Sequence, residues 1–233
     1  MNLKVKFISK TIKAKTLNEI LFIKGKKIKN NILNPIIKTV LDNQLFQDQL
    51  FIQKEYKNSN FIFVNCKKLS MSTDYENIGS KLFDYLNKNK IENSYIDSNK
   101  ADINHIQLER VLHGAKLKSY NFNIYKTNNK NKKNINLNIF EKQKNKSNVL
   151  RKKLNALVDG VFFTRDLVSE PGNILHPDEY AKRLVKLKKY GLKVTVYDEK
   201  KLKKLGCNAL VGVGQGSIRG SYLVTIEWNG NKS

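Results

Sequence analysis

The chain has 233 residues, of which 40% are hydrophobic, so disorder along its whole length is excluded and one large or two modest domains are expected. It holds no apolar run of about eighteen residues and no basic stretch followed by an apolar block at its start, so neither a membrane span nor export is predicted. Cys66 and Cys207 stand too far apart in the sequence for a disulfide framework or a metal-ligand spacing. A reducing, cytoplasmic location is therefore expected.

The formal net charge of +24 would ordinarily suggest phosphate backbones or anionic lipid as partners. However, Lys, Asn and Ile are enriched together along the whole chain, as an A+T-rich coding sequence would produce. The cations are nearly all Lys, whereas bidentate recognition of bases or phosphates prefers Arg. Composition thus favours coding bias, and a nucleic-acid-binding or assembly module remains the alternative function.

The first 140 residues alternate between strand and helix patterns. Thr73 and Glu76 have the spacing of a capping box, which predicts a helix there, and a second helix is expected over 103–120. A short helix is expected from Asn34 and Pro35. Stretch 134–140 alternates so strictly that an edge or half-exposed strand is expected. The strand patterns lie at 3–7, 18–24, 50–53, 60–66, 95–97 and 134–140. This order predicts an α/β fold.

A long amphipathic helix follows, with apolar residues at helical spacing from Leu150 to Val168. Pro171 and Gly172 end it, because proline cannot donate the hydrogen bond that a continuing helix needs. Pro177 then begins a second helix, and a strand at 192–196, a short helix capped by Asp198 and a strand at 221–228 come next. These last elements read as the start of a second α/β unit whose apolar strand faces lack cover.

Segment Thr164–Pro177 (TRDLVSEPGNILHP) resembles the sequence that leads into the catalytic domain of the leucyl aminopeptidase family, the two-metal cytosolic aminopeptidases. Segments 191–196 (GLKVTV) and 205–217 (LGCNALVGVGQGS) are similar to the next part of that family, in the same order and spacing. Residues 114–122 (GAKLKSYNF) are similar to the stretch that closes its N-terminal domain.

The resemblance implies a macro-like N-terminal α/β domain over 1–145, a connecting helix over 146–172, and an incomplete N-terminal portion of the catalytic domain over 173–233. It also implies release of N-terminal amino acids from peptides, two divalent metals (Zn or Mn) and a homohexamer in the intact family.

The family's ligands come from a Gly-Lys-Gly…Phe-Asp…Gly-Gly strand and loop and from an Asn-Thr-Asp-Ala-Glu-Gly-Arg stretch, both expected after Trp228. No position here matches those motifs, so no catalytic, metal or substrate-binding residue is assigned, and no cofactor is expected to bind this chain. The sequence is thus interpreted as a fragment truncated before the metal ligands, inactive alone and not hexameric.

Other residues suggest chemistry only weakly. His105 and His113 lie two helical turns apart, and His176 stands at a helix-cap position, so all three are interpreted as structural. Asp178 and Glu179 are explained by the helix dipole.

Asp166 and Glu170 are interpreted as solvated charges. The run Gly212–Ser217 lacks the last glycine of the dinucleotide pattern and closes a helix instead of opening one, so it is interpreted as a turn that lets the next strand pack closely.

Overall fold

The computed structural model describes residues 3–9, 18–25, 39–40, 48–56, 59–127, 134–141 and 148–230. The chain divides into two compact units, Met1–Phe162 and Phe163–Ser233. This division falls inside the long helix α5 (Asn148–Ser169). The sequence predicted this helix as a connecting segment between two domains. In the described residues, no helix has the length and apolar character that crossing a bilayer requires.

The first unit is built on a six-stranded sheet in the order β1-β6-β5-β2-β4-β3. All neighbouring pairs are parallel except β3 and β4. The α/β prediction is therefore confirmed. The strands are β1 (Leu3–Ile8), β2 (Asn18–Ile23), β3 (Phe51–Tyr56), β4 (Ser59–Asn65), β5 (Asn93–Asp97) and β6 (Ile135–Phe140).

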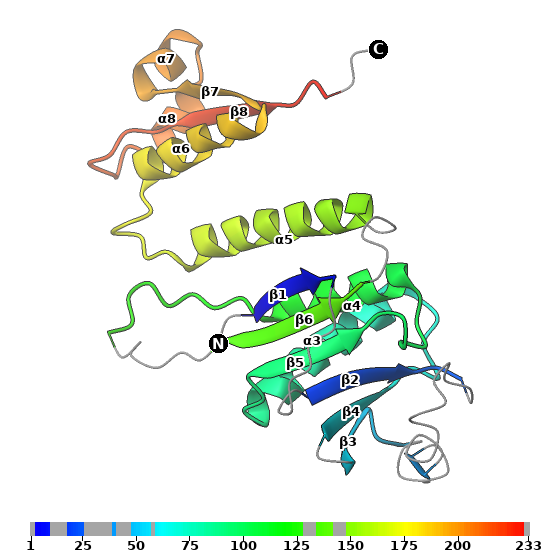
Figure 1. The fold of residues 1–233 in the computed structure, drawn as a ribbon. Coiled ribbons are helices and arrows are strands. Elements are labelled where there is room, and N and C mark those ends of the chain that lie inside the picture. Colours follow the sequence, from blue (N-terminus) through cyan, green and yellow to red (C-terminus); the bar gives the residue numbers. More distant parts are fainter. Residues whose placement is uncertain are drawn as a thin grey trace. The chain divides into compact units, whose positions relative to one another are not determined.

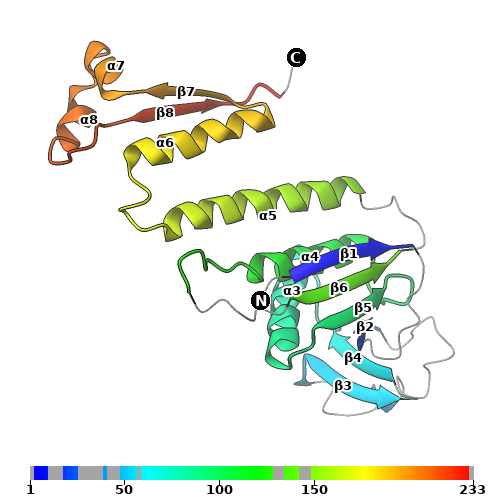
Figure 2. The same cartoon turned by 60° about the vertical axis from the view of Figure 1, so that its left-hand side comes forward.

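Two helices, α3 (Ser72–Lys88) and α4 (His105–Lys118), pack against each other and cover one face of this sheet (Figures 1 and 2). Leu108, Val111, Leu112 and Ala115 of α4 are buried in the core between sheet and helices, as their helical spacing predicted. A smaller cluster, which includes Leu21 and Phe63, covers the other face of β2 and β4. Those strands are buried on both faces because their apolar residues are nearly continuous.

Two local predictions are corrected by the structure. Strand β6 was expected to be an edge or a half-exposed strand; it lies between β1 and β5, so it is no edge strand, and its residues alternate between buried and partly buried. Helix α3 begins at Ser72, and Asp74, not Glu76, accepts from the backbone amides of Ser70 and Met71, at 3.0 and 2.9 Å. The helix expected from Asn34 lies largely outside the described residues. Only Thr39 and Val40 of that stretch are described, and both are helical.

The long helix α5 (Asn148–Ser169) joins the first unit through side chains of its first part. Only Leu154 and Val158 of its apolar stripe are buried, while Leu157 is 49% exposed. Arg151 instead forms an ion pair with Glu109 of α4 at 2.6 Å and with Glu141 after β6 at 3.1 Å. Its guanidinium also stacks on the ring of Phe7, 3.4 Å from the centroid.

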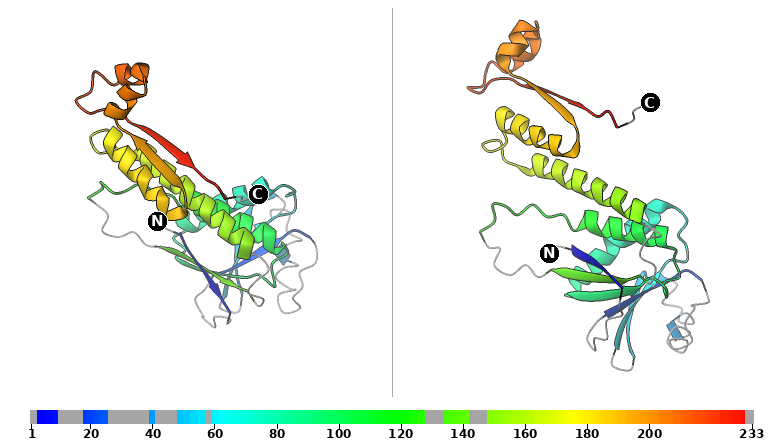
Figure 3. Two further views of the ribbon diagram at one scale, coloured as in Figure 1. Left: turned by 90° about the horizontal axis from the view of Figure 1, so that it is seen from above. Right: turned by 45° about the horizontal axis from the view of Figure 1, so that its top comes forward.

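The second unit contains α6 (Pro177–Val185), the 3₁₀ helix η1 (Lys186–Tyr190), β7 (Lys193–Tyr197), α7 (Glu199–Lys204), α8 (Asn208–Val213) and β8 (Leu223–Glu227). Strands β7 and β8 form a two-stranded antiparallel sheet, and α6 packs against both (Figure 3). This order of elements agrees with the sequence prediction for residues 177–228.

Candidate functional site

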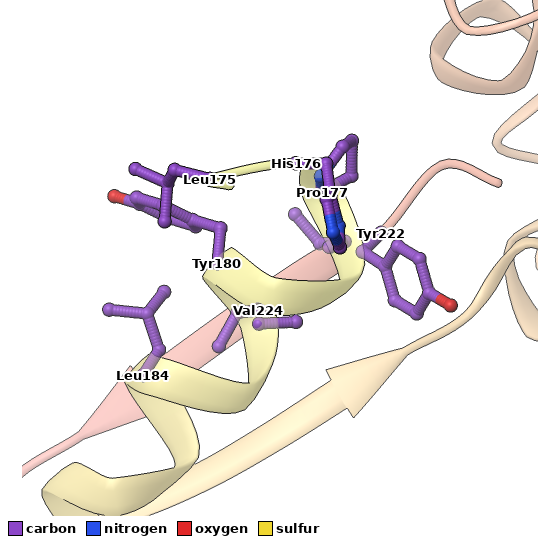
Figure 4. A pocket seen from close by; sticks show the side chains of 9 residues that line it. Leu175, His176, Pro177, Tyr180, Leu184, Tyr222 and Val224 are labelled. Atoms are coloured by element: carbon purple, nitrogen blue, oxygen red, sulfur yellow. The ribbon is translucent and has the colours of Figure 1, made fainter. Parts of the chain in front are cut away.

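A pocket of about 520 Å³ lies in the second unit between α6 and β8 (Figure 4). Its walls come from the turn before α6, from the inner side of α6 and from the residues that enter β8. The lining residues are Leu175, His176, Pro177, Tyr180, Ala181, Leu184, Tyr222, Leu223 and Val224. Most of the lining side chains are apolar, and the polar ones are one imidazole and two phenol groups.

His176 enters this pocket because it caps helix α6. The backbone amide of Glu179 donates to His176 Nδ1 at 3.4 Å, and Pro177 occupies the first helical position. Proline fits there because its missing N–H would be unpaired anyway. The predicted start of this helix and the structural role of His176 as a cap are both confirmed.

His176 also takes part in a polar cluster with Asp178 and Arg219. Asp178 Oδ1 contacts His176 Nδ1 directly, and Arg219 Nη1 lies 3.2 Å from each of these two atoms. Partial burial raises the pKa of the Asp178 carboxyl, but its own backbone amide, His176 and Arg219 outweigh this and hold the pKa below its usual value. Asp178 is therefore a charged anchor that ties the segment before β8 to the start of α6.

A second ion cluster crosses the break between α5 and α6. Arg183 Nη1 donates to Glu170 Oε1 at 2.8 Å, and Arg183 Nε donates to Glu179 Oε1 at 3.2 Å. The Glu170 side chain is only 4% exposed, so the expectation that it is a solvated charge was wrong. The hydrogen bond that Arg183 donates to Glu170 raises the pKa of Arg183, which keeps the pair charged.

The other two histidines lie on α4 in the first unit and do not meet. His105 is at the solvent-exposed start of the helix, whereas His113 is buried. Burial lowers the pKa of His113, so the neutral ring is favoured. Both positions agree with the structural role predicted for them.

The glycine-rich run 212–217 contains the last two residues of α8 and begins the turn toward β8. A Cβ atom on Gly214 would lie 2.0 Å from Ser221 Oγ, so the Ser221 hydroxyl would have to rotate away to make room for a side chain at this position. This contact supports the structural interpretation of the run and leaves no open cradle for a phosphate at Gly214.

In the first unit, ligands of open α/β sheets bind outside the carboxyl ends of the parallel strands. At the end of β2, the backbone amides of Lys24 and Gly25 point to one acceptor, Asp102 Oδ2, at 2.9 and 2.6 Å. Lys24 Nζ donates to the Tyr75 hydroxyl at 3.0 Å. The two amides that could hold an anion are thus already satisfied by the chain's own carboxylate.

No group of three or more His, Cys, Asp or Glu side chains that could hold a metal ion occurs within the described ranges. The His176–Asp178 pair supplies two such groups, but the guanidinium of Arg219 already bonds both. A cation there competes with a metal for the same acceptors. The described residues therefore do not fit a two-metal centre, and no metal-dependent step is assigned to them.

Comparison with known proteins explains why the second unit has this form. The profile of the "Cytosol aminopeptidase family, catalytic domain" matches residues 162–233. The chain is thus similar to the leucyl aminopeptidase family in this part. It is 42% identical over 142 residues to the probable cytosol aminopeptidase of Phytoplasma mali, an alignment that covers 59% of this chain and 28% of that protein. The probable cytosol aminopeptidase of Caulobacter vibrioides is 41% identical over 124 residues, covering 52% of this chain and 25% of the relative.

Solved structures show the same fold for nearly the whole chain. A mutant of tomato leucine aminopeptidase matches with a TM-score of 0.70 at 16% identity, covering 97% of this chain and 50% of the tomato chain. The bottromycin maturation enzyme BotP in complex with Mn matches with a TM-score of 0.65 at 15% identity, covering 93% of this chain and 45% of BotP. The chain thus spans about a quarter of the curated leucyl aminopeptidase relatives and about half of these solved chains.

Proposed function

We propose that these residues form the N-terminal part of a metal-dependent cytosolic aminopeptidase that releases N-terminal amino acids from peptides. The observation that carries this proposal is the match of residues 162–233 to the family's catalytic domain. Relatives named as cytosol aminopeptidases and the fold of tomato leucine aminopeptidase support it. A cytoplasmic location and the division into 1–145, 146–172 and 173–233 belong to the same proposal.

We further infer that the 233 residues alone hydrolyse no peptide. No position in the sequence matches the family's two ligand motifs, and the polar cluster in the second unit joins one carboxylate to an arginine and a histidine. Two-metal hydrolysis needs several carboxylates to hold both ions and the water between them. We also infer that this chain binds no metal. Because the intact family assembles as hexamers largely through the catalytic half, we infer that this chain forms no hexamer.

The test is hydrolysis of leucine p-nitroanilide by the purified chain with Mn²⁺ or Zn²⁺ added. No turnover above buffer is expected, whereas the full-length Phytoplasma mali relative serves as the positive control under the same conditions. Turnover by the 233-residue chain that a chelator abolishes would contradict the inference of inactivity. Failure of the full-length relative to cleave the anilide would instead weaken the proposed family activity.

The nucleic-acid alternative is not proposed because the arginines best suited to phosphate recognition are already paired. Ion pairs with carboxylates inside the chain are formed by Arg110, Arg151, Arg183 and Arg219. A guanidinium held by a carboxylate is less available for bidentate contact with phosphate. The remaining positive charge comes almost wholly from lysines.

A further inference from the structure

The segment that follows strand β8 contains the one Asn–Gly step of the sequence, Asn229–Gly230. It leaves β8 as an irregular trace without helix or strand (Figure 1). Both residues are exposed, and neither has a hydrogen-bond partner in the part of the chain that the structure describes. The backbone amide of Gly230 and the side-chain amide of Asn229 are therefore both open to water.

Glycine at position 230 leaves its own amide nitrogen without a shielding side chain. The three atoms nearest to a Cβ built on Gly230 all belong to the indole of Trp228, the closest at 2.2 Å. The Trp228 side chain is itself 74% exposed, so the indole can turn away without disturbing a packed core. Glycine also adopts backbone dihedrals that other residues rarely reach. The chain can therefore bend until the Gly230 nitrogen meets the side-chain carbonyl of Asn229.

This approach places a nucleophile and an electrophile at the spacing that closes a five-membered ring. The Gly230 nitrogen gives its proton to water or hydroxide and attacks Cγ of Asn229, in a reaction favoured because both groups belong to one chain. The N–Cγ bond forms while the Cγ–Nδ2 bond breaks, and the side-chain nitrogen takes up a proton from water and leaves as ammonia. Water then opens the ring at either carbonyl. The products are aspartate and isoaspartate, with one water consumed and one ammonia released.

We propose that Asn229 is a site of spontaneous deamidation in the folded chain. Two comparable steps are held in regular structure. Asn93–Ser94 also places a small residue after an asparagine, but it lies in β5, where Ser94 is buried and Asn93 Oδ1 accepts a hydrogen bond from the neighbouring strand at 3.0 Å. The step 159–160, an Asp–Gly pair that closes the same ring, lies inside α5. Folding thus restrains these two steps and leaves Asn229 free to react.

The modification changes the charge at one end of the two-stranded sheet. Glu227 forms an exposed ion pair with Lys193 of β7 at 3.2 Å. Aspartate at position 229 places a further carboxylate two residues after Glu227 and lowers the formal net charge of +24 by one. Isoaspartate also lengthens the main chain by one carbon at this position. The aged chain should therefore elute earlier than the fresh chain from a cation-exchange column.

The first test compares Asn229 with Asn93 in the native 233-residue chain and in urea. Peptide mapping by mass spectrometry follows the fraction of each residue that is converted. Asn229 should convert at about the same rate in both conditions, because no folded structure has to open first. Asn93 should convert about tenfold or more slowly in the native chain than in urea. Native protection of Asn229 as strong as that of Asn93 would overturn the proposal.

The second test changes the attacking residue. Gly230→Val should slow conversion of Asn229 about tenfold or more, because a β-branched side chain stiffens the backbone and crowds the amide nitrogen. The matched control is Gly172→Val, at an exposed turn where nothing lies within 4 Å of the added Cβ, and the rate at Asn229 should be unchanged. Both variants should keep the circular dichroism of the parent chain. An unchanged rate in Gly230→Val, or equal slowing in both variants, would overturn the ring closure.

The dependence of the rate on pH provides a third readout. The Gly230 amide loses its proton before it attacks, so conversion of Asn229 should accelerate several-fold from pH 7 to pH 8. The isoaspartate product also distinguishes this route from direct hydrolysis of the side-chain amide, which gives aspartate alone. Conversion that does not depend on pH, or that yields no isoaspartate, would contradict the proposed reaction.

Discussion

Gly79 of α3 and Gly114 of α4 each lie against the backbone of the other helix. A Cβ atom on Gly79 would be 1.8 Å from the carbonyl oxygen of Val111, and one on Gly114 would be 1.9 Å from that of Glu76. The two helices therefore approach each other as closely as their backbones allow. This crossing fixes the helical layer that covers the sheet of the first unit.

Gly79→Ala and Gly114→Ala should each destabilise the first unit by about 2–4 kcal/mol, because rigid backbone cannot yield as a flexible side chain does. The matched control is Gly160→Ala in α5, where nothing lies within 4 Å of the added Cβ. That change should be neutral or stabilise by up to about 1 kcal/mol through helix propensity. Urea unfolding measures the free energy of unfolding of all three variants. Equal changes in this free energy at the three positions would refute the close crossing of α3 and α4.

Arg151 is expected to be the main polar link between α5 and the rest of the first unit. The Glu109 side chain is 5% exposed, so Arg151→Met would leave a buried carboxylate without its partner. A loss of about 3–5 kcal/mol is expected, and Arg151→Met with Glu109→Leu should recover most of it. Lys118→Met breaks an exposed pair with Asp84 and should cost less than about 1 kcal/mol. Urea unfolding measures these losses in the free energy of unfolding. Equal losses for the buried and the exposed ion pair would show that burial does not determine the loss.

His113 should make the first unit less stable in mild acid. Burial lowers its pKa, so the folded chain binds the proton less readily than the unfolded chain, whose value is about 6.5. The stability that the neutral ring contributes is complete above the pKa of the unfolded chain. It is lost as the pH falls through the lower pKa of the folded chain. His113→Gln should flatten the free energy of unfolding between about pH 7 and pH 5.5. A parent chain without such a slope would disprove the effect.

Local sequence patterns predicted the elements well because each pattern reports burial of its own side chains. Continuous apolar runs marked the interior strands β2 and β4, and Pro177 marked the start of α6. The same logic failed for β6. Its alternating asparagines suggested an edge or a half-exposed strand, and the edge alternative was wrong: they lie in an interior strand, where Asn136 Nδ2 donates to Asn93 Oδ1 of the neighbouring strand at 3.0 Å.

The polar clusters of the second unit could not be predicted in the same way, because their members are distant in sequence. Arg219 and Asp178 are 41 positions apart in the sequence. Arg183 and Glu170 are 13 positions apart and are separated by the non-helical segment between α5 and α6. Only the Glu179–Arg183 pair has the i,i+4 spacing that a sequence shows directly. Asp178 and Glu179 were therefore interpreted through the helix dipole alone.

The two cysteines should differ sharply in reactivity. Cys66 is buried, and desolvation raises the pKa of its thiol to about 12, so roughly one molecule in ten thousand holds the reactive thiolate at pH 8. Cys207 is partly exposed. A disulfide reagent such as DTNB should titrate one thiol in the native chain and two in denaturant. Cys207→Ala should abolish the native reaction and Cys66→Ala should leave it unchanged; rapid native reaction of Cys66 would contradict its burial.

Divalent metal should neither stabilise the chain nor be needed for its fold. The described residues join His176 and Asp178 to Arg219 and offer no group of three metal-ligating side chains, so Mn²⁺ or Zn²⁺ has no preformed site there. A site with a Kd of about 1 μM would raise the free energy of unfolding by about 4 kcal/mol at 1 mM metal, which thermal unfolding would detect. No such rise with metal, and no fall with EDTA, is expected. Calorimetric titration that found two tightly bound ions per chain would overturn both this expectation and the inferred inactivity.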